Sequence, residues 1–329
     1  MKIKISVALF FFSTPLFQGC SSSETEKEQS DAEAAGLRIA YNVLLNEETD
    51  NYEVFSMDLS GENRVNITNL EGLEWAYDAW KDRLFYVSDK DTTHRVYFLY
   101  ETDEFGEVHR RVSRYRLRDS WMSTRNNGKE IIVNPRVEGD SAFYILNTQT
   151  GQLVSKIYTN KRSYNDPCFS PNGSRVVFRG SDMAFKKDNG YVDELYIINA
   201  DGSGIRQLTH YPPDDTLSMW YEYHAAPPIW EPNRDIITYA SVQGGNSSIF
   251  EIKPDGTNQR KITPDSLHAT WHSWSPNGKW LVFDGYIRAD TVKNYDIFLM
   301  NFSEKTIERL TYDTLYQQAP VFVETRMNE

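Results

Sequence analysis

Three of the six histidines in the chain lie close to the starts of two short segments that resemble each other. His224 and His268 each lie six residues before a tryptophan, Trp230 and Trp274, and His272 lies two residues before the second of these. Imidazole nitrogens suit transition metals, so a divalent metal site is one chemistry that this spacing could support. The alternative interpretation is structural, with the same rings hydrogen-bonded along a channel.

Other side chains near these segments could bind a ligand without a metal. Four aromatic residues could stack on sugar rings, or could pack in the core or at the rim of the fold: Trp220, Tyr221, Tyr223 and Trp271. Three carboxylates occur at related places, Asp78, Asp119 and Asp166, and we interpret them as turn caps or solvated channel residues rather than metal ligands.

A repeated pattern of strands and tight turns must position these residues. Three stretches align directly, each a short strand, a Pro-Asn turn and a second strand: residues 167–178, 229–239 and 273–283. Proline presets φ for such turns, and Asn-Gly supplies their positive-φ positions. A third alternating strand and a short fourth strand follow each pair, the fourth ending in Leu-Thr or Ile-Thr. Four antiparallel strands in a repeating unit predict a propeller blade.

Counting first strands predicts six blades and a closed ring. They are centred near Trp80, Trp121, Phe169, Trp230, Trp274 and Phe322. The last has no successors, while the segment from residue 36 has later strands but no first one. The C-terminal strand should therefore complete the blade begun by the N-terminus, which leaves no open sheet edge. We expect an all-β, six-bladed propeller of four-stranded antiparallel blades over residues 36–325.

The strings Asp193-Glu-Leu-Tyr-Ile-Ile-Asn-Ala-Asp-Gly-Ser203 and Arg206-Gln-Leu-Thr209, with the Ser-Pro-Asn-Gly turns at 170–173 and 275–278, resemble the WD40-like propeller repeat of the TolB family. The likeness covers roughly residues 36–324 and is most specific in blades four to six. Prolyl oligopeptidase-like enzymes and oligogalacturonate lyases share this repeat. The sequence contains no Gly-X-Ser-X-Gly elbow, so we do not expect a peptidase.

The weaker likeness to oligogalacturonate lyases implies a specific metal site. In those propellers, histidines and a glutamine bind a divalent metal in the channel, which here implies His224, His268, His272 and Gln318, or Gln317 in place of the last. A metal would acidify the proton beside a uronate carboxylate and permit β-elimination. The pattern departs from that of the lyases in spacing, and the sequence indicates no base.

The N-terminus predicts export and a lipid anchor. Lys2 and Lys4 precede an apolar run that is too short to span a bilayer, and the run ends in Leu16-Phe-Gln-Gly-Cys20. This string resembles a bacterial lipobox, which implies a signal peptide over residues 1–19 and acylation, including palmitate, at Cys20. An ordinary cleaved secretory signal is the alternative. Residues 20–35 lack aromatics and favour a flexible tether.

Charge and cysteine content restrict the partners. Removing residues 1–19 takes away two lysines and no acid, so the net charge falls from −12 to −14, and we expect no nucleic-acid partner. With Cys20 acylated, Cys168 has no disulfide partner, and we predict a buried structural thiol. We expect a monomeric, non-enzymatic propeller without a cofactor. It should be anchored in the cell envelope, at the outer membrane on its periplasmic or surface face, and bind an envelope protein or glycan. The alternative is a metal-dependent polysaccharide lyase.

Overall fold

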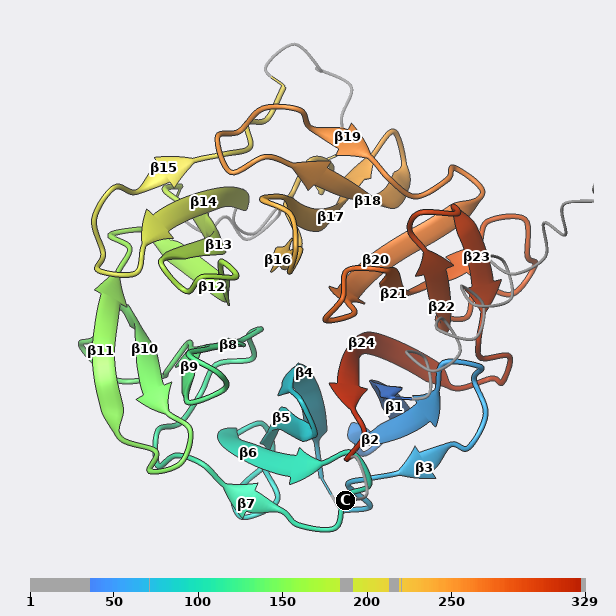
Figure 1. Ribbon diagram of the computed structural model, residues 1–329, viewed down its shortest axis with the longest axis horizontal. Helices are drawn as coiled ribbons and strands as arrows, with labels where there is room; N and C mark the ends of the chain where they lie inside the picture. The colour runs from blue at the N-terminus through green and yellow to red at the C-terminus, as the bar shows by residue number, and fades with distance from the viewer. Residues whose placement is uncertain (1–35, 71, 184–191, 213–218, 220, 327–329) are drawn as a thin grey trace, which may run out of the picture. The chain divides into compact units, whose positions relative to one another are not determined.

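The chain folds into six sheets around a central axis (Figure 1). The computed structural model describes residues 36–70, 72–183, 192–212, 219 and 221–326. Each sheet has four strands, and neighbouring strands within it run antiparallel. The predicted fold class is confirmed. No helix of the described residues is long and apolar enough to cross a membrane.

The strands of each blade are named below from the axis outward. Blade 1 comprises β24 (Tyr316–Glu324), β1 (Leu37–Asn46), β2 (Asn51–Asp58) and β3 (Val65–Asn66). Blade 2 comprises β4 (Glu74–Trp80), β5 (Arg83–Ser88), β6 (Phe98–Asp103) and β7 (Arg110–Arg111). Blade 3 comprises β8 (Ser123–Arg125), β9 (Glu130–Val133), β10 (Ala142–Asn147) and β11 (Leu153–Tyr158).

The second half of the ring follows the same order. Blade 4 comprises β12 (Ser163–Phe169), β13 (Arg175–Ser181), β14 (Glu194–Asn199) and β15 (Arg206–Gln207). Blade 5 comprises β16 (Ile229–Trp230), β17 (Ile237–Gln243), β18 (Asn246–Ile252) and β19 (Arg260–Lys261). Blade 6 comprises β20 (Leu267–Trp274), β21 (Trp280–Ile287), β22 (Asp296–Asn301) and β23 (Thr306–Arg309).

The C-terminal strand closes the ring on the N-terminal one, as predicted. β24 pairs antiparallel with β1, from Leu37 opposite Glu324 to Leu44 opposite Tyr316. A hydrogen bond from the Ala319 amide to Asp284 Oδ2, at 2.8 Å, ties this blade to blade 6. Closure therefore joins the two ends of the propeller domain and gives β1 an inner neighbour, so that blade 1 has four strands like the other blades.

The repeated Thr of the fourth strand has a structural role. In four blades its hydroxyl accepts a hydrogen bond from an amide near the start of the third strand, just where the short outer strand ends. These bonds, at 2.9 to 3.0 Å, run from Val54 to Thr68, Leu195 to Thr209, Ile249 to Thr263 and Ile297 to Thr311. The hydroxyl thus replaces a partner that the outer strand no longer provides.

The Ser-Pro-Asn-Gly turns connect the first and second strands of blades 4 and 6. In the first of them, Ser170 Oγ accepts a hydrogen bond from the Arg175 amide at 3.0 Å, and Gly173 has a φ of 68°. A side chain on Gly173 would be strained in this left-handed conformation. Blades 2, 3 and 5 make tight turns at the same end of their first strands. Blade 1 has no such turn, because its first strand is β24 and its second is β1, so five turns and the end of β24 surround one mouth of the axis (Figure 1).

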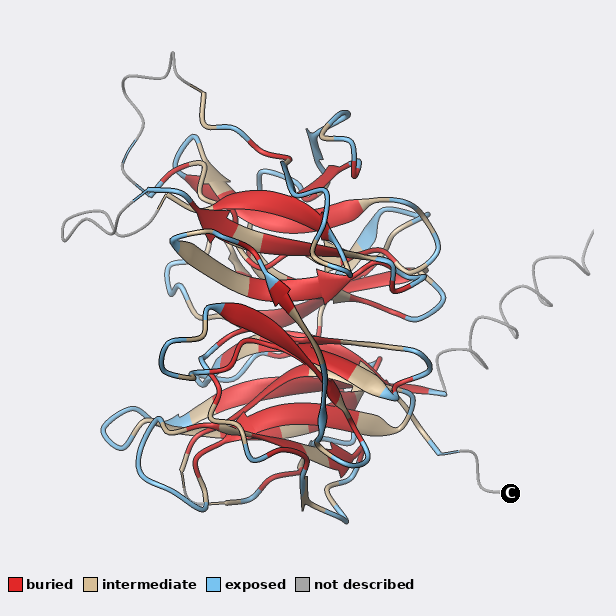
Figure 2. Ribbon diagram, turned by 90° about the vertical axis from the view of Figure 1, so that its left-hand side faces the viewer, coloured by how far each residue is buried: buried red, intermediate tan, exposed pale blue. Residues whose placement is uncertain are grey.

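The core of the propeller lies between neighbouring blades. Figure 2 shows strands that are buried along most of their length and joined by exposed turns. One such layer joins blades 3 and 4, where Phe143 packs edge-on against Phe178 with ring centroids 5.6 Å apart. Cys168 also lies in the core, as a free and buried thiol, which confirms its predicted structural role.

Candidate functional site

His272 is a buried hydrogen-bonding residue on β20. Its side chain is 4% exposed, and its Nε2 lies 2.8 Å from Thr238 Oγ1 on β17 of the neighbouring blade. Burial lowers its pKa to about 4, because a desolvated imidazolium is unfavourable. The ring is therefore neutral at physiological pH and links blades 5 and 6.

His268 lies at the start of the same strand but among different neighbours. Its ring stacks on Tyr286 with centroids 4.4 Å apart and planes 7° apart, and its Nε2 lies 3.2 Å from the hydroxyl of Tyr295. Burial, with smaller contributions from Arg288 and Lys293, lowers its pKa to about 4. These aromatic contacts give the ring a defined packing position.

His224 and Gln318 are the two predicted metal ligands that line a common cavity. This cavity, of about 290 Å³, is bordered by residues of blades 4 to 6 and of β24, and Tyr221 and Trp271 also line it. His272 lines a different cavity. The described part of the chain contains no group of three His, Cys, Asp or Glu side chains placed to hold a metal ion. Metal binding by the four residues stays a prediction.

Of the four aromatic ligand candidates, Tyr221 and Trp271 line the smaller cavity. Trp220 lies outside the described residues. Tyr223 has a φ of 64° and its ring lies 6.2 Å from that of Tyr211, whereas Tyr221 is 40% exposed beside the smaller cavity. Trp271 also points across the propeller axis, where it contacts aromatic residues of other blades.

An aromatic cluster joins residues of three blades near the axis. Trp271 of blade 6 lies 5.9 Å from Trp75 of blade 2 and 5.1 Å from Trp121 of blade 3, measured between ring centroids. Tyr77 adds a further contact at 4.6 Å from Trp121. Because Tyr77 lines the larger cavity and Trp271 the smaller one, the cluster lies between the two. Trp121 precedes β8 and does not lie in it. Its amide donates a hydrogen bond to Asp166 of blade 4, at 3.0 Å, and not to a neighbouring strand of blade 3.

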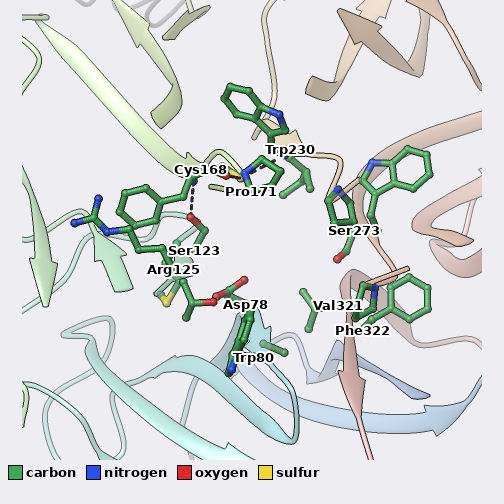
Figure 3. A pocket seen from close by; sticks show the side chains of 18 of the residues that line it. Asp78, Trp80, Ser123, Arg125, Cys168, Pro171, Trp230, Ser273, Val321 and Phe322 are labelled. Atoms are coloured by element: carbon green, nitrogen blue, oxygen red, sulfur yellow. Dashed lines mark hydrogen bonds between the residues drawn. The ribbon is translucent and has the colours of Figure 1, made fainter. Parts of the chain in front are cut away.

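The larger cavity opens at the mouth surrounded by the first turns, and we call it the cup. Its volume is about 670 Å³, and every blade contributes to it. Figure 3 shows its walls. One lining residue from the innermost strand of each blade defines it: Asp78, Thr124, Phe169, Trp230, Ser273 and Phe322.

The rim of the cup is formed by the turns themselves. Pro171, Pro232 and Pro276 line it, and these are the prolines that the sequence repeat places in the turns. Arg125 also lines the cup but is already engaged, since its guanidinium contacts Glu130 at 2.7 Å and donates to the carbonyl of Gly173 at 2.9 Å. The rim is thus rigid and its arginine is neutralised.

Asp78 and Glu324 are the acidic residues that line the cup, and the carboxyl of Asp78 is directed into the enclosed space (Figure 3). Its Oδ2 is buried and has no hydrogen-bond partner. Burial raises the pKa of Asp78 to about 7. Hydrogen bonds from Thr124 and from the Ala79 amide act in the opposite direction, because they favour the ionised carboxylate. The cup therefore holds a carboxyl that is incompletely satisfied by the protein.

The other two aspartates of the sequence set are engaged with protein groups. Asp166 is buried, pairs with Arg179 at 2.7 Å and accepts the Trp121 amide, while Asp119 accepts a hydrogen bond from the Tyr77 hydroxyl. These contacts link the two aspartates to other blades and are not turn caps. Asp78 differs from them, and its place two residues before the end of a first strand is the sequence signal that separates it from the others.

These features define a class of protein, a closed six-bladed propeller with a cup at its first-turn mouth and an aromatic cluster beneath it. Residues 78–283 match the family model described as the TolB beta propeller domain. The chain therefore belongs to that family, as the sequence motifs indicated.

Similar proteins cover parts of the chain. Dipeptidyl-peptidase 5 of Porphyromonas endodontalis is 31% identical over 159 residues, which is 47% of this chain and 20% of that protein. The Tol-Pal system protein TolB of Anaeromyxobacter dehalogenans is 30% identical over 96 residues, 29% of this chain and 20% of that protein. The chain thus matches about a fifth of the length of each of these relatives.

Among solved structures, TolB from Acinetobacter baumannii resembles the fold with a TM-score of 0.67 and 16% identity. The likeness covers 88% of this chain and 67% of that one. Identity at this level shows the fold alone. The cup's chemistry must therefore be derived from the residues of this chain.

Proposed function

We propose that this chain is a non-catalytic binding propeller of the cell envelope, which holds an extended segment of a protein or glycan partner in the cup. The observation that carries the proposal is the cup itself, since all six blades contribute to one cavity of about 670 Å³. Cavities of 300 to 1,000 Å³ are typical of ligand sites. The family and the TolB relative favour an envelope location.

The walls of the cup suit an inserted segment better than a flat docking surface. Phe169, Trp230 and Phe322 supply apolar area, and rigid aromatic residues lose little conformational entropy on binding. The aromatic cluster lies between the cup and the smaller cavity. A loop, a chain terminus or a short glycan fits such a site, because each can enter from one side.

Crosslinking in intact cells tests whether the cup is the binding site. A photoreactive amino acid in place of Glu324, which lines the cup, should form an adduct with the partner. Ser273→Trp fills the cup without changing charge and should abolish the adduct. Ser60→Trp is the matched control, since Ser60 lies exposed in the turn after β2. Equal adduct formation in both variants would contradict binding in the cup, and mass spectrometry separates protein from glycan.

The lipid anchor is part of this proposal and has its own test. Cys20 lies outside the described residues, so the support comes from the residues around it in the sequence. Metabolic labelling with an alkyne-tagged fatty acid should mark the wild-type protein and not Cys20→Ser. Cys168→Ser is the control and should stay labelled. A wild-type protein that takes up no label and is released from the envelope by high salt would refute the anchor.

The metal-dependent lyase is the second candidate, because His224 and Gln318 share the smaller cavity with Arg179. Arg179 is paired with Asp166 at 2.7 Å and with Asp193 at 3.4 Å, so it is held as a cation rather than freed as a base. Elemental analysis of the purified chain should show a stoichiometric divalent metal if this candidate holds. His224→Ala should then remove it, together with any formation of unsaturated products from oligouronides.

A further inference from the structure

Asp78 presents an unusual combination inside the cup. Its carboxyl lines a large cavity, yet Oδ2 is shielded and receives no hydrogen bond. Leaving a buried carboxylate oxygen without a partner costs free energy. Asp166 on β12 avoids this cost through Arg179 and the Trp121 amide. The protein therefore leaves in the cup a carboxyl that lacks the partners it provides to Asp166.

The cations near the cup do not compensate Asp78. Arg125 is engaged by Glu130 and Gly173 and lies over the ring of Phe169, 4.6 Å from its centroid. Lys81 belongs to the turn at the rim and is exposed. Neither forms an ion pair with Asp78 in the described structure. The missing counterion can therefore come from a ligand.

The depth and the walls of the cup match a long basic side chain. Asp78 lies two residues before the end of β4, which places it about 7 Å below the turn at a strand rise of about 3.3 Å per residue. Lysine and arginine carry a flexible apolar stem of similar reach. Such a stem can lie along apolar walls while its charged end meets a polar group, and Val321 and Phe322 form such a wall (Figure 3).

We infer that the cup recognises a lysine or arginine side chain on an extended protein segment, whose charged end pairs with the Asp78 carboxylate. This inference rests on the proposed function and selects protein over glycan as the partner. Neutral and acidic sugars supply no cation and would leave the carboxylate unpaired. A basic side chain would supply the counterion and the hydrogen bonds that the protein lacks at this position.

Selection from a displayed library of random peptides tests this inference with the full-length chain. Enriched peptides should contain a fixed lysine or arginine. A synthetic enriched peptide with an acetylated N-terminus should keep its affinity, because the side chain carries the recognised charge. Acetylation of its lysine, or replacement of its arginine by citrulline, should weaken binding at least tenfold, and Asp78→Asn should do the same for the unmodified peptide.

Glu324→Gln is the matched control, since it removes one negative charge from the same cup. It should change affinity by less than threefold, which separates a specific pair from general attraction. Peptides without a fixed basic residue, or with equal affinity for Asp78→Asn, would overturn the inference and leave the cup as a binding site. Peptide selections that Ser273→Trp does not affect would overturn the proposed function as well. The melting temperature of Asp78→Asn should be at least that of wild type, which excludes unfolding as the cause.

Discussion

Asp78 in the cup and Asp284 at the junction of blades 6 and 1 are two buried carboxyls with opposite consequences. Burial raises the pKa of each to about 7. Asp284 accepts hydrogen bonds from the Thr270 hydroxyl, from the Trp271 amide at 3.0 Å and from the Ala319 amide at 2.8 Å. Asp78 retains an oxygen without a partner. Two carboxyls whose pKa burial raises alike therefore stabilise the ring in one place and leave an unmet binding capacity in the other.

The difference follows from what each carboxyl faces. Asp284 is fully buried on β21 and bridges the first strands β20 and β24. It does so where the pairing of each strand is irregular, between Ala269 and His272 on β20 and near Ala319 on β24. Its three donors belong to the fold. Asp78 is on a first strand and faces the axis, where no other blade reaches it with a donor sufficient for both oxygens. At the Asp284 joint the protein itself supplies the hydrogen-bond donors, whereas at Asp78 a ligand would have to supply the missing partner.

The largest expected effect is the loss of the Asp284 joint. Asp284→Asn keeps the shape but turns one acceptor oxygen into a donor that opposes an amide N–H. We expect a loss of about 2–4 kcal/mol in the free energy of unfolding, because buried groups are left unsatisfied. Urea denaturation at pH 8 measures this loss. A change below about 0.5 kcal/mol would mean that the joint does not stabilise the ring closure.

Asp78→Asn should raise the free energy of unfolding, whereas Asp284→Asn should lower it. The size of the gain should depend on pH. The folded-state pKa of about 7 lies above the ordinary carboxyl value of 3.8, so the folded protein binds the proton more tightly. The associated stability is fully present below about pH 4 and is lost as pH rises to about 7. Asparagine does not ionise, so the variant should become more stable than wild type by about 1–3 kcal/mol at pH 8.

Denaturation of both proteins at pH 5, 6, 7 and 8 checks this expectation. The gap should widen up to about pH 7 and then stay level. Glu74 and Asp284, whose pKa values burial also raises to about 7, titrate in both proteins and cancel in the difference. In the cup, His272 with a pKa of about 4 and Cys168 with a pKa of about 12 stay neutral over this range. A constant gap would show that Asp78 is ionised throughout.

The architecture could be predicted because its determinants are local. Ser170 and Asn172 shape their own turn, and Thr209 bonds an amide fourteen residues away in the same blade. The repeated strings therefore indicated the blades, and the unmatched strand near Phe322 indicated closure. Residues distant in sequence meet only after those blades are arranged, so the aromatic cluster of Trp75, Trp121 and Trp271 was not anticipated.

The candidate site was harder to predict because equal spacing does not guarantee equal position. His224 and His268 both lie six residues before a tryptophan, but β16 has 2 residues and β20 has 8. His224 therefore lies in the segment before its strand, whereas His268 lies within one and stacks on Tyr286. Asp78 was visible in the sequence, but its missing partner depends on what the other five blades place around the axis.

The smallest expected effect concerns the hydrogen bonds that Asp78 does receive. Thr124 favours the ionised carboxylate, so Thr124→Val should raise the pKa of Asp78 further and lower the free energy of unfolding at pH 8 by about 0.5–1.5 kcal/mol. At pH 5, where the carboxyl is largely protonated, the loss should be smaller. Repeating the substitution in Asp78→Asn should remove its pH dependence, because the interaction is between these two side chains. An unchanged pH dependence in the double variant would show that Thr124 acts through local packing and not through Asp78. The contrast between Asp78 and Asp284 would then depend only on the oxygen of Asp78 that has no hydrogen-bond partner.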